Sequence, residues 1–223
     1  MQRIFILTLL CLFTCILSSC FTINDHIVFN RDGSGSVKTT VDMSSMMQML
    51  GMFLPDSLKE DMQIDNILDS DLSQYKKIAG ISNAKITSDK EYSYTVSYNF
   101  ANIKALNQAV ALNEKDSNIP AGFGEMMKTQ YSFKKGKISR NTSIDPSHLE
   151  TEGINIAESK EMFQFMNSPT YNITYQLPKN VKKIDLKNEK STVVKDKNTV
   201  SISYNLLDFL EAKGEVMNHN IKF

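Results

Sequence analysis

The chain has 223 residues, of which 41% are hydrophobic and 22% are charged. This composition is typical of a folded globular protein and excludes a disordered or repetitive chain. The 25 basic and 25 acidic residues balance, so no overall positive field would attract nucleic acid.

Residues 1–20 have the pattern of an export signal. Arg3 is followed by an almost unbroken apolar run from Ile4 to Leu17. This run has roughly 14 residues, whereas a transmembrane helix needs about 20. We therefore expect residues 1–19 to be a cleaved signal peptide. Its removal takes Arg3 away and leaves the mature chain, residues 20–223, with a formal net charge of −1.

The signal ends in Leu17, Ser18, Ser19 and Cys20, a string that resembles the bacterial lipobox. The resemblance implies cleavage before Cys20, a diacylglycerol on its thiol and an acyl chain, such as palmitate, on its amine. The alternative is a cysteine beside an ordinary cleavage site. Cys11 and Cys15 lie in the signal, so Cys20 would be the mature chain's single thiol and no internal disulfide is expected. Two or more acyl chains would attach the protein stably to a membrane.

The first predicted hairpin follows soon after Cys20. Ile27 and Phe29 alternate with their neighbours before the turn string Arg31-Asp32-Gly33-Ser34-Gly35. The return strand places Val37, Thr39 and Val41 on one face.

Helical patterns separate this hairpin from the next strands. Asp42 is an N-cap candidate for a helix over residues 43–54, which Pro55 would end. Further helical patterns run from Leu58 to Tyr75 and from Ile103 to Leu112, and residues 113–124 are expected to form a loop. Between the second and third helices, residues 92–100 alternate strictly and predict a strand with one buried face, paired with residues 84–87.

The second half of the chain is predicted to be richer in strands. Tyr131 to Ser143 indicates a hairpin that turns at Lys135-Gly136, and a short helix is expected over residues 159–166. Period-two patterns then mark strands over residues 171–177, 184–186 and 200–204, followed by a helical turn at 206–211 and a closing strand at 215–223. This order predicts an α+β fold, in which antiparallel sheet built from hairpins carries helices packed on one face. We expect one domain over residues 20–223, with a β-rich C-terminal subdomain from about residue 168.

These features together resemble the LppM-type lipoprotein domain and are also similar to lipoproteins of Bacteroidota. The resemblance is carried by the lipobox, the Asp-Gly-Ser-Gly turn, the Asp42-Met43-Ser44 helix start and the segment from Tyr175-Gln176-Leu177-Pro178 to the strand Thr199–Tyr204. It implies a fold and a location in the cell envelope, and it brings no catalytic motif.

The turn string partly matches a calcium-binding loop. Asn30, Asp32, Ser34 and Gly35 match loop positions one, three, five and six. Position twelve is Val41, where a bidentate glutamate is needed, so a plain hairpin turn explains these residues better.

Methionines are concentrated in the first predicted helix. A helical wheel places Met43, Met46 and Met47 on the core stripe, whereas Met49 borders it and Met52 points to the polar face. Core packing is the favoured interpretation, because methionine is a pliable core residue. The alternatives are a surface at Met49 and Met52 for an apolar ligand or partner, and a thioether site for Cu(I).

Two segments are strongly charged. Residues 56–71 have a net charge of −5 and favour a solvated helix face, with a weak cation site as the alternative. Residues 179–197 contain seven lysines and three acids and favour an exposed face that protects sheet edges. Contact with an acidic partner or with lipid headgroups is the alternative for this segment.

We find no sequence signal for catalysis, a metal or a cofactor. His26, His148 and His219 are dispersed along the chain, and nucleophile-elbow and phosphate-loop motifs are missing. We therefore expect a non-catalytic envelope lipoprotein that is held by Cys20 on the periplasmic side of an outer membrane and that binds a partner protein or an apolar ligand. The alternatives are a hydrolase without a recognisable motif and a structural subunit of an envelope complex.

Overall fold

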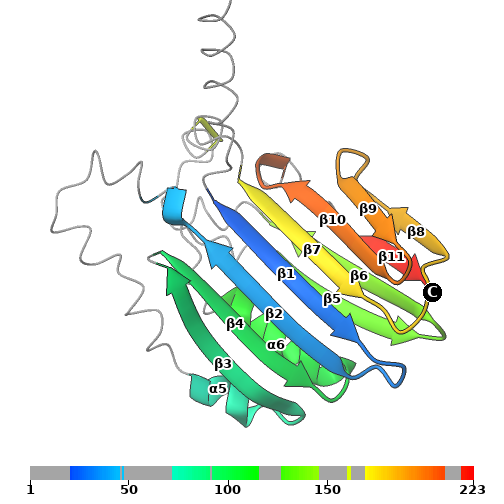
Figure 1. The fold of residues 1–223 in the computed structure, drawn as a ribbon, viewed down its shortest axis with the longest axis horizontal. Coiled ribbons are helices and arrows are strands. Elements are labelled where there is room, and N and C mark those ends of the chain that lie inside the picture. Colours follow the sequence, from blue (N-terminus) through cyan, green and yellow to red (C-terminus); the bar gives the residue numbers. More distant parts are fainter. Residues whose placement is uncertain are drawn as a thin grey trace, which may run out of the picture.

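The computed structural model describes most of the chain after the signal, namely residues 21–45, 47, 72–90, 92–115, 127–145, 160–161, 169–208 and 217–223. Strands dominate these residues (Figure 1). Seven lie in one sheet: β1 (Thr22–Phe29), β2 (Gly35–Asp42), β3 (Ile81–Lys90), β4 (Ser93–Phe100), β7 (Thr170–Gln176), β9 (Thr192–Asp196) and β10 (Thr199–Asn205). Four lie in another: β5 (Met127–Lys134), β6 (Lys137–Ile144), β8 (Lys183–Leu186) and β11 (His219–Lys222).

The larger sheet is mixed. Its strand order is β3-β4-β2-β1-β7-β10-β9, and the central pair β1 and β7 is parallel while the other neighbours are antiparallel. The smaller sheet has the order β5-β6-β11-β8 and is antiparallel throughout. Segments far apart in sequence therefore meet in both sheets.

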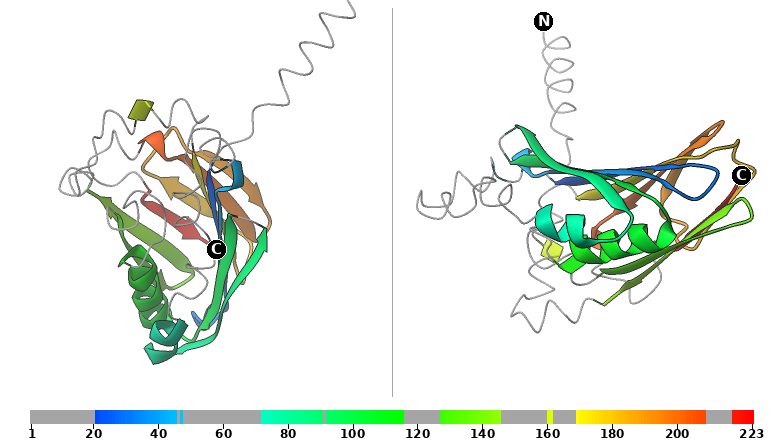
Figure 2. Two further views of the ribbon diagram at one scale, coloured as in Figure 1. Left: turned by 90° about the vertical axis from the view of Figure 1, so that its left-hand side faces the viewer. Right: turned by 90° about the horizontal axis from the view of Figure 1, so that it is seen from below.

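The two sheets face each other as two layers (Figure 2). Alternating residues of the larger sheet, such as Ile27, Ile173 and Ile202, are fully buried, and so are Ile138 and Ile221 of the smaller sheet. Because neighbouring residues in a strand point to opposite faces, each sheet presents one apolar face to the other. The core lies between the layers.

The expected α+β arrangement is wrong. The described residues form a predominantly β structure in which a second sheet, instead of a layer of helices, covers most of the larger sheet. Helix α6 (Ile103–Lys115) lies beside β5 and contacts β3 and β4, and α5 (Leu72–Lys77) lies against β3. Alternation in a strand indicates that one face is buried, but it does not reveal whether a helix or another sheet covers that face.

Several predicted elements are confirmed. The β1–β2 and β5–β6 hairpins, the β3–β4 pair and helix α6 form where the sequence patterns place them. The β5–β6 turn consists of Lys135 and Gly136, both with positive φ, as a two-residue hairpin turn of this twist requires. Strand β9 was not predicted.

Other predictions differ in detail or lie outside the described residues. Ser93 and Thr95 of β4 are buried although their positions alternate with the core residues, and the Thr95 hydroxyl is 2.9 Å from that of Thr40 on β2. Residues 113–115 continue α6 instead of starting a loop. The predicted helices over residues 43–54, 58–75 and 159–166 and the turn at 206–211 lie largely outside the described residues.

Candidate functional site

The lipobox and the proposed methionine surface cannot be placed. Leu17, Ser18, Ser19 and Cys20 lie outside the described residues, as do Met49 and Met52. Two methionines predicted for the core stripe are described: Met43 and Met47 are each only 5% exposed. Core packing of these two is therefore confirmed.

The turn after β1 is a hydrogen-bonded hairpin turn. The Asp32 carboxylate accepts the backbone N–H of Ser34 at 3.0 Å and its hydroxyl at 2.7 Å, and these bonds lower the pKa of Asp32. The Asn30 side-chain amide donates to the same hydroxyl at 2.9 Å. Among the described residues, no three His, Cys, Asp or Glu side chains come together as a metal site.

The two charged segments and the three histidines have different outcomes. Residues 56–71 and His148 lie outside the described residues. The seven lysines between residues 179 and 197 are exposed, as predicted, and His26 is exposed on β1. His219, by contrast, is 1% exposed and lies in the interior.

The interior holds a charged residue that the sequence analysis missed. Arg140 on β6 is 2% exposed and points between the two sheets. Its cross-strand neighbours in the smaller sheet are Tyr131 on β5 and His219 on β11. Together with Asp25, Tyr171, Tyr175 and Tyr204 of the larger sheet, these residues form what we call the interior polar cluster.

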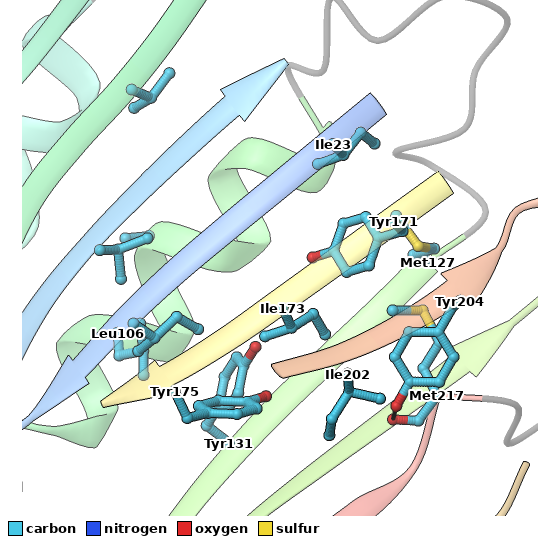
Figure 3. Packing of buried hydrophobic residues seen from close by; sticks show 14 of the residues in the cluster. Ile23, Leu106, Met127, Tyr131, Tyr171, Ile173, Tyr175, Ile202, Tyr204 and Met217 are labelled. Atoms are coloured by element: carbon cyan, nitrogen blue, oxygen red, sulfur yellow. Dashed lines mark hydrogen bonds between the residues drawn. The ribbon is translucent and has the colours of Figure 1, made fainter. Parts of the chain in front are cut away.

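Arg140 contacts the larger sheet through one tyrosine. Its Nη2 donates to the Tyr171 hydroxyl at 3.3 Å, and its Cζ lies 5.2 Å from the Tyr171 ring centroid and 5.9 Å from that of Tyr131. Such cation–π contacts stabilise a guanidinium that has lost its water. Figure 3 shows Tyr171 and Tyr175 along β7, with Tyr131 beside Tyr175.

The Tyr171 hydroxyl connects Arg140 to a carboxylate. Tyr171 donates to Asp25, which also accepts the Thr39 hydroxyl at 2.6 Å. Asp25 lies between Ile23 and Ile27 on β1, at a position whose alternation faces the core. Burial raises the pKa of Tyr171 well above its ordinary value, so the tyrosine stays protonated and can donate.

Two guanidinium nitrogens of Arg140 have no hydrogen-bond partner among the described residues. Nε and Nη1 of Arg140 are buried and make no hydrogen bond in the described structure, and the same holds for the Tyr98 hydroxyl on β4. Arginine stays charged in proteins, and a buried charge without hydrogen bonds is expensive. The unpartnered nitrogens therefore distinguish this cluster from ordinary core packing.

His219 is held in one neutral form. Its Nδ1 lies 3.0 Å from both the Met217 carbonyl oxygen and the Tyr204 hydroxyl. The carbonyl oxygen can only accept and the hydroxyl can do either, so a proton on Nδ1 suits both contacts. Nε2 then accepts from the Tyr175 hydroxyl at 2.8 Å. Burial and, to a smaller extent, the charge of Arg140 together lower the pKa of His219 to about 3. The ring is thus a neutral part of the hydrogen-bond network.

Glu114 forms a titratable border of the cluster. Its Oε1 accepts the backbone N–H of Thr129 at 2.8 Å, near the end of α6. Burial raises its pKa to about 7, against the opposing effects of the Thr129 hydrogen bond and of Arg140. Glu114 therefore changes charge near neutral pH.

A sequence signal for Arg140 and Asp25 existed. Each charged residue occupies the inward parity of its strand, between Ile138 and Ile144 in the first case and between Ile23 and Ile27 in the second. A charged residue in an apolar alternation predicts a buried polar site. Only the three-dimensional structure shows that Arg140 and Asp25 belong to one cluster.

Comparisons with known proteins identify no family. No protein-family model matches the chain, and no curated protein matches its sequence. The structure is similar to the folded domain of the Mycobacterium tuberculosis LppM protein, solved by NMR, with a TM-score of 0.44 and 12% sequence identity. That similarity covers 92% of this chain and 89% of the LppM domain. Among the helices of the described residues, none is long and apolar enough to span a bilayer.

Proposed function

We propose that this chain is a non-catalytic lipoprotein of the cell envelope, anchored through Cys20, whose two-layered body binds an apolar molecule with an acidic head group. The observation that carries the proposal is the pair of unpartnered nitrogens on buried Arg140. A carboxylate or phosphate would supply the acceptors that these two nitrogens lack, because the Asp25 carboxylate reaches the guanidinium only through the Tyr171 hydroxyl.

The surroundings of Arg140 suit a ligand that is apolar beyond its head group. The side chains that pack beside the polar cluster include Ile173, Ile202 and Met217, which are fully buried, together with tyrosine rings (Figure 3). Both the acidic head group and the apolar part of the ligand would thus be removed from water. The Tyr98 hydroxyl offers a further unused donor on β4.

The chemistry of the cluster favours binding over catalysis. Both His219 nitrogens are engaged and its pKa is about 3, so it is a poor base near neutral pH. Burial also keeps the Tyr175 and Tyr171 hydroxyls protonated. A ligand that Arg140 binds is therefore expected to leave the site unchanged.

A direct test measures binding of oleate, oleyl phosphate and oleyl alcohol to the full chain by isothermal titration calorimetry. We expect both acids to bind. The neutral alcohol should bind at least about tenfold more weakly, because it carries no negative charge to interact with the guanidinium of Arg140. Arg140→Met should lose the preference for acids, whereas Arg31→Met, at an exposed turn arginine, should keep it. Equal affinity for the acids and the alcohol would contradict the proposal. The ratio of the affinities for oleate and oleyl phosphate identifies whether a carboxylate or a phosphate is the preferred head group.

The anchor has its own test. The lipobox string predicts that intact-mass analysis of the membrane fraction finds residues 20–223 with a diacylglyceryl and acyl addition on Cys20. Cys20→Ala should give an unprocessed form or a form lost from membranes. An unmodified Cys20 in the wild-type protein would contradict the anchor without affecting the binding proposal.

A further inference from the structure

Four lysines form one row across the smaller sheet. Lys134 on β5 pairs with Lys137 on β6, Lys137 pairs with Lys222 on β11, and Lys222 pairs with Lys183 on β8. Directly paired residues point to the same face of a sheet, and the adjacent Ile138 and Ile221 are buried in the core. The lysine row therefore lies on the outer face, one residue from each strand.

The lysine row opposes the stability of the sheet. Cross-strand neighbours have Cβ atoms about 5 Å apart, and like charges at that distance repel. Lys183 Nζ contacts Asp185 Oδ1 at 2.6 Å, in a pair whose lysine side chain is 62% exposed. Within the described residues, Lys134, Lys137 and Lys222 form no ion pair with a carboxylate. The row thus holds more positive charge than its surroundings neutralise.

Edge protection does not explain the row. Lysines on the edge strands β5 and β8 would discourage pairing with another chain. Strands β6 and β11 are interior strands with both edges already paired, so Lys137 and Lys222 have no such role. Lys135, in the turn between β5 and β6, adds a charge at a position with φ of 49°, where asparagine or glycine is usual.

The rest of the outer face is hydrophilic. The outward positions of the four strands beyond the row are serine, asparagine, glutamine, lysine and aspartate, namely Lys128, Gln130, Ser132, Ser139, Asn141, Ser143, Asp185 and Asn220. Protein interfaces concentrate aromatic residues, methionine and arginine and are poor in lysine and serine. A hydrated, strongly anionic partner fits this face better than a protein surface.

The row also lies away from the start of the body. β1 begins at Thr22 and runs to the turn at residues 30–34, a distance of about 26 Å for a strand of this length. Gly33 in that turn lies against the ring of Phe133, the neighbour of Lys134. A membrane that held the chain just before Thr22 would therefore be remote from the row.

We propose that the lysine row binds an acidic polysaccharide carrying one carboxylate per sugar ring. Adjacent strands place the backbone positions of the four lysines about 5 Å apart, and the rings of an extended polysaccharide repeat at a comparable length. A chain lying across the strands would bring successive carboxylates to successive lysines. Ser139 and Asn220 lie on the same face, and although the Ser139 hydroxyl donates to the Asn220 side chain at 2.6 Å, the amide of Asn220 would remain a donor for sugar hydroxyl groups.

The test measures binding of a fluorescently labelled mannuronate oligosaccharide to the full chain at low salt. Lys137→Gln/Lys222→Gln should weaken binding about tenfold or more, whereas Lys38→Gln/Lys85→Gln, with the same net charge and exposed strand positions on β2 and β3, should change it less than about threefold. Lys137→Arg/Lys222→Arg should retain binding. The thermal midpoint of the glutamine row variant should not fall, which separates lost binding from lost folding.

Other results overturn the proposal. Equal loss of affinity in the row variant and the control variant would show that the attraction is unspecific. If the wild-type chain did not bind the oligosaccharide, an acidic polysaccharide would be excluded as the partner. Binding to phosphatidylglycerol vesicles that needs Lys137 and Lys222, without binding to the oligosaccharide, would assign the row to a membrane surface instead. None of these outcomes depends on the ligand of Arg140.

Discussion

Arg140 destabilises the ligand-free protein, and in our proposal the same side chain binds the ligand. Its guanidinium has lost its water, yet two of its nitrogens make no hydrogen bond in the described structure. One hydrogen bond to Tyr171 and two ring contacts compensate in part. A group that is costly in the empty protein becomes favourable when an anion completes its hydrogen bonds.

This trade-off predicts that Arg140→Met stabilises the ligand-free protein. Replacing a poorly paired buried charge by an apolar side chain of similar length is expected to raise the free energy of unfolding by about 1–4 kcal/mol. Chemical denaturation of protein freed of bound lipid measures the change. A lower free energy of unfolding for Arg140→Met would contradict this prediction, and it would show that Tyr171 and the ring contacts already stabilise the guanidinium.

Glu114 predicts a pH dependence near neutrality. Its folded pKa of about 7 lies above the ordinary value of 4.5, so the folded state binds more protons and stability falls as pH rises through that range. The fall attributable to Glu114 between about pH 6 and about pH 8 is on the order of 1 kcal/mol.

Glu114→Gln isolates this effect, because glutamine keeps an oxygen that can accept from Thr129. Denaturation curves should show that the variant lacks the decline above about pH 6 that the wild-type protein shows. His219 contributes the opposite slope only below its ordinary pKa of 6.5, since its folded pKa is lowered. Parallel profiles for the wild-type protein and the variant would rule out a raised Glu114 pKa.

Sequence patterns indicate which single residues are buried, but they do not indicate which distant residues these contact. Met43 and Met47 were correctly assigned to the core from the helical wheel. Arg140 was not recognised, although it interrupts the alternation of Ile138, Thr142 and Ile144 on β6. Its partner Tyr171 lies on another sheet, and nothing local in a sequence relates the two.

The segment after β2 gives a prediction for a single helix. Met47 is buried, so Met47→Gln places an amide among apolar side chains and should cost about 2 kcal/mol. Met52 was assigned to the polar face by the same wheel, so Met52→Gln should leave the thermal midpoint almost unchanged. Thermal unfolding of both variants tests this, and equal losses would show that the wheel does not hold beyond Met47.

Hairpins were the elements that sequence reasoning located best. The turn of β1–β2 and the Lys135-Gly136 turn combine local turn residues with alternating strands, so their signals are short-range. Strand β9 was not predicted because its sequence does not alternate between apolar and polar residues, and Val194 is apolar although it is 64% exposed. Edge strands with little burial carry little periodicity.

The arrangement of the whole molecule depends on contacts between distant segments. β1 pairs in parallel with β7, about 150 residues later, and β11 inserts between β6 and β8. Such pairings leave no local trace, which is why an antiparallel sheet covered by helices was expected instead of two facing sheets. The interior polar cluster arises from that facing arrangement, because Arg140 and Asp25 belong to different sheets.

The central claim is that the body holds an acidic apolar ligand at Arg140. Native mass spectrometry of the full-length protein, gently released from bacterial membranes, tests it most directly. We predict that the wild-type protein and Arg31→Met carry a dissociable molecule that fragments to an organic acid with an apolar chain, and that Arg140→Met does not. The same adduct on Arg140→Met, or no adduct on the wild-type protein, would contradict the claim.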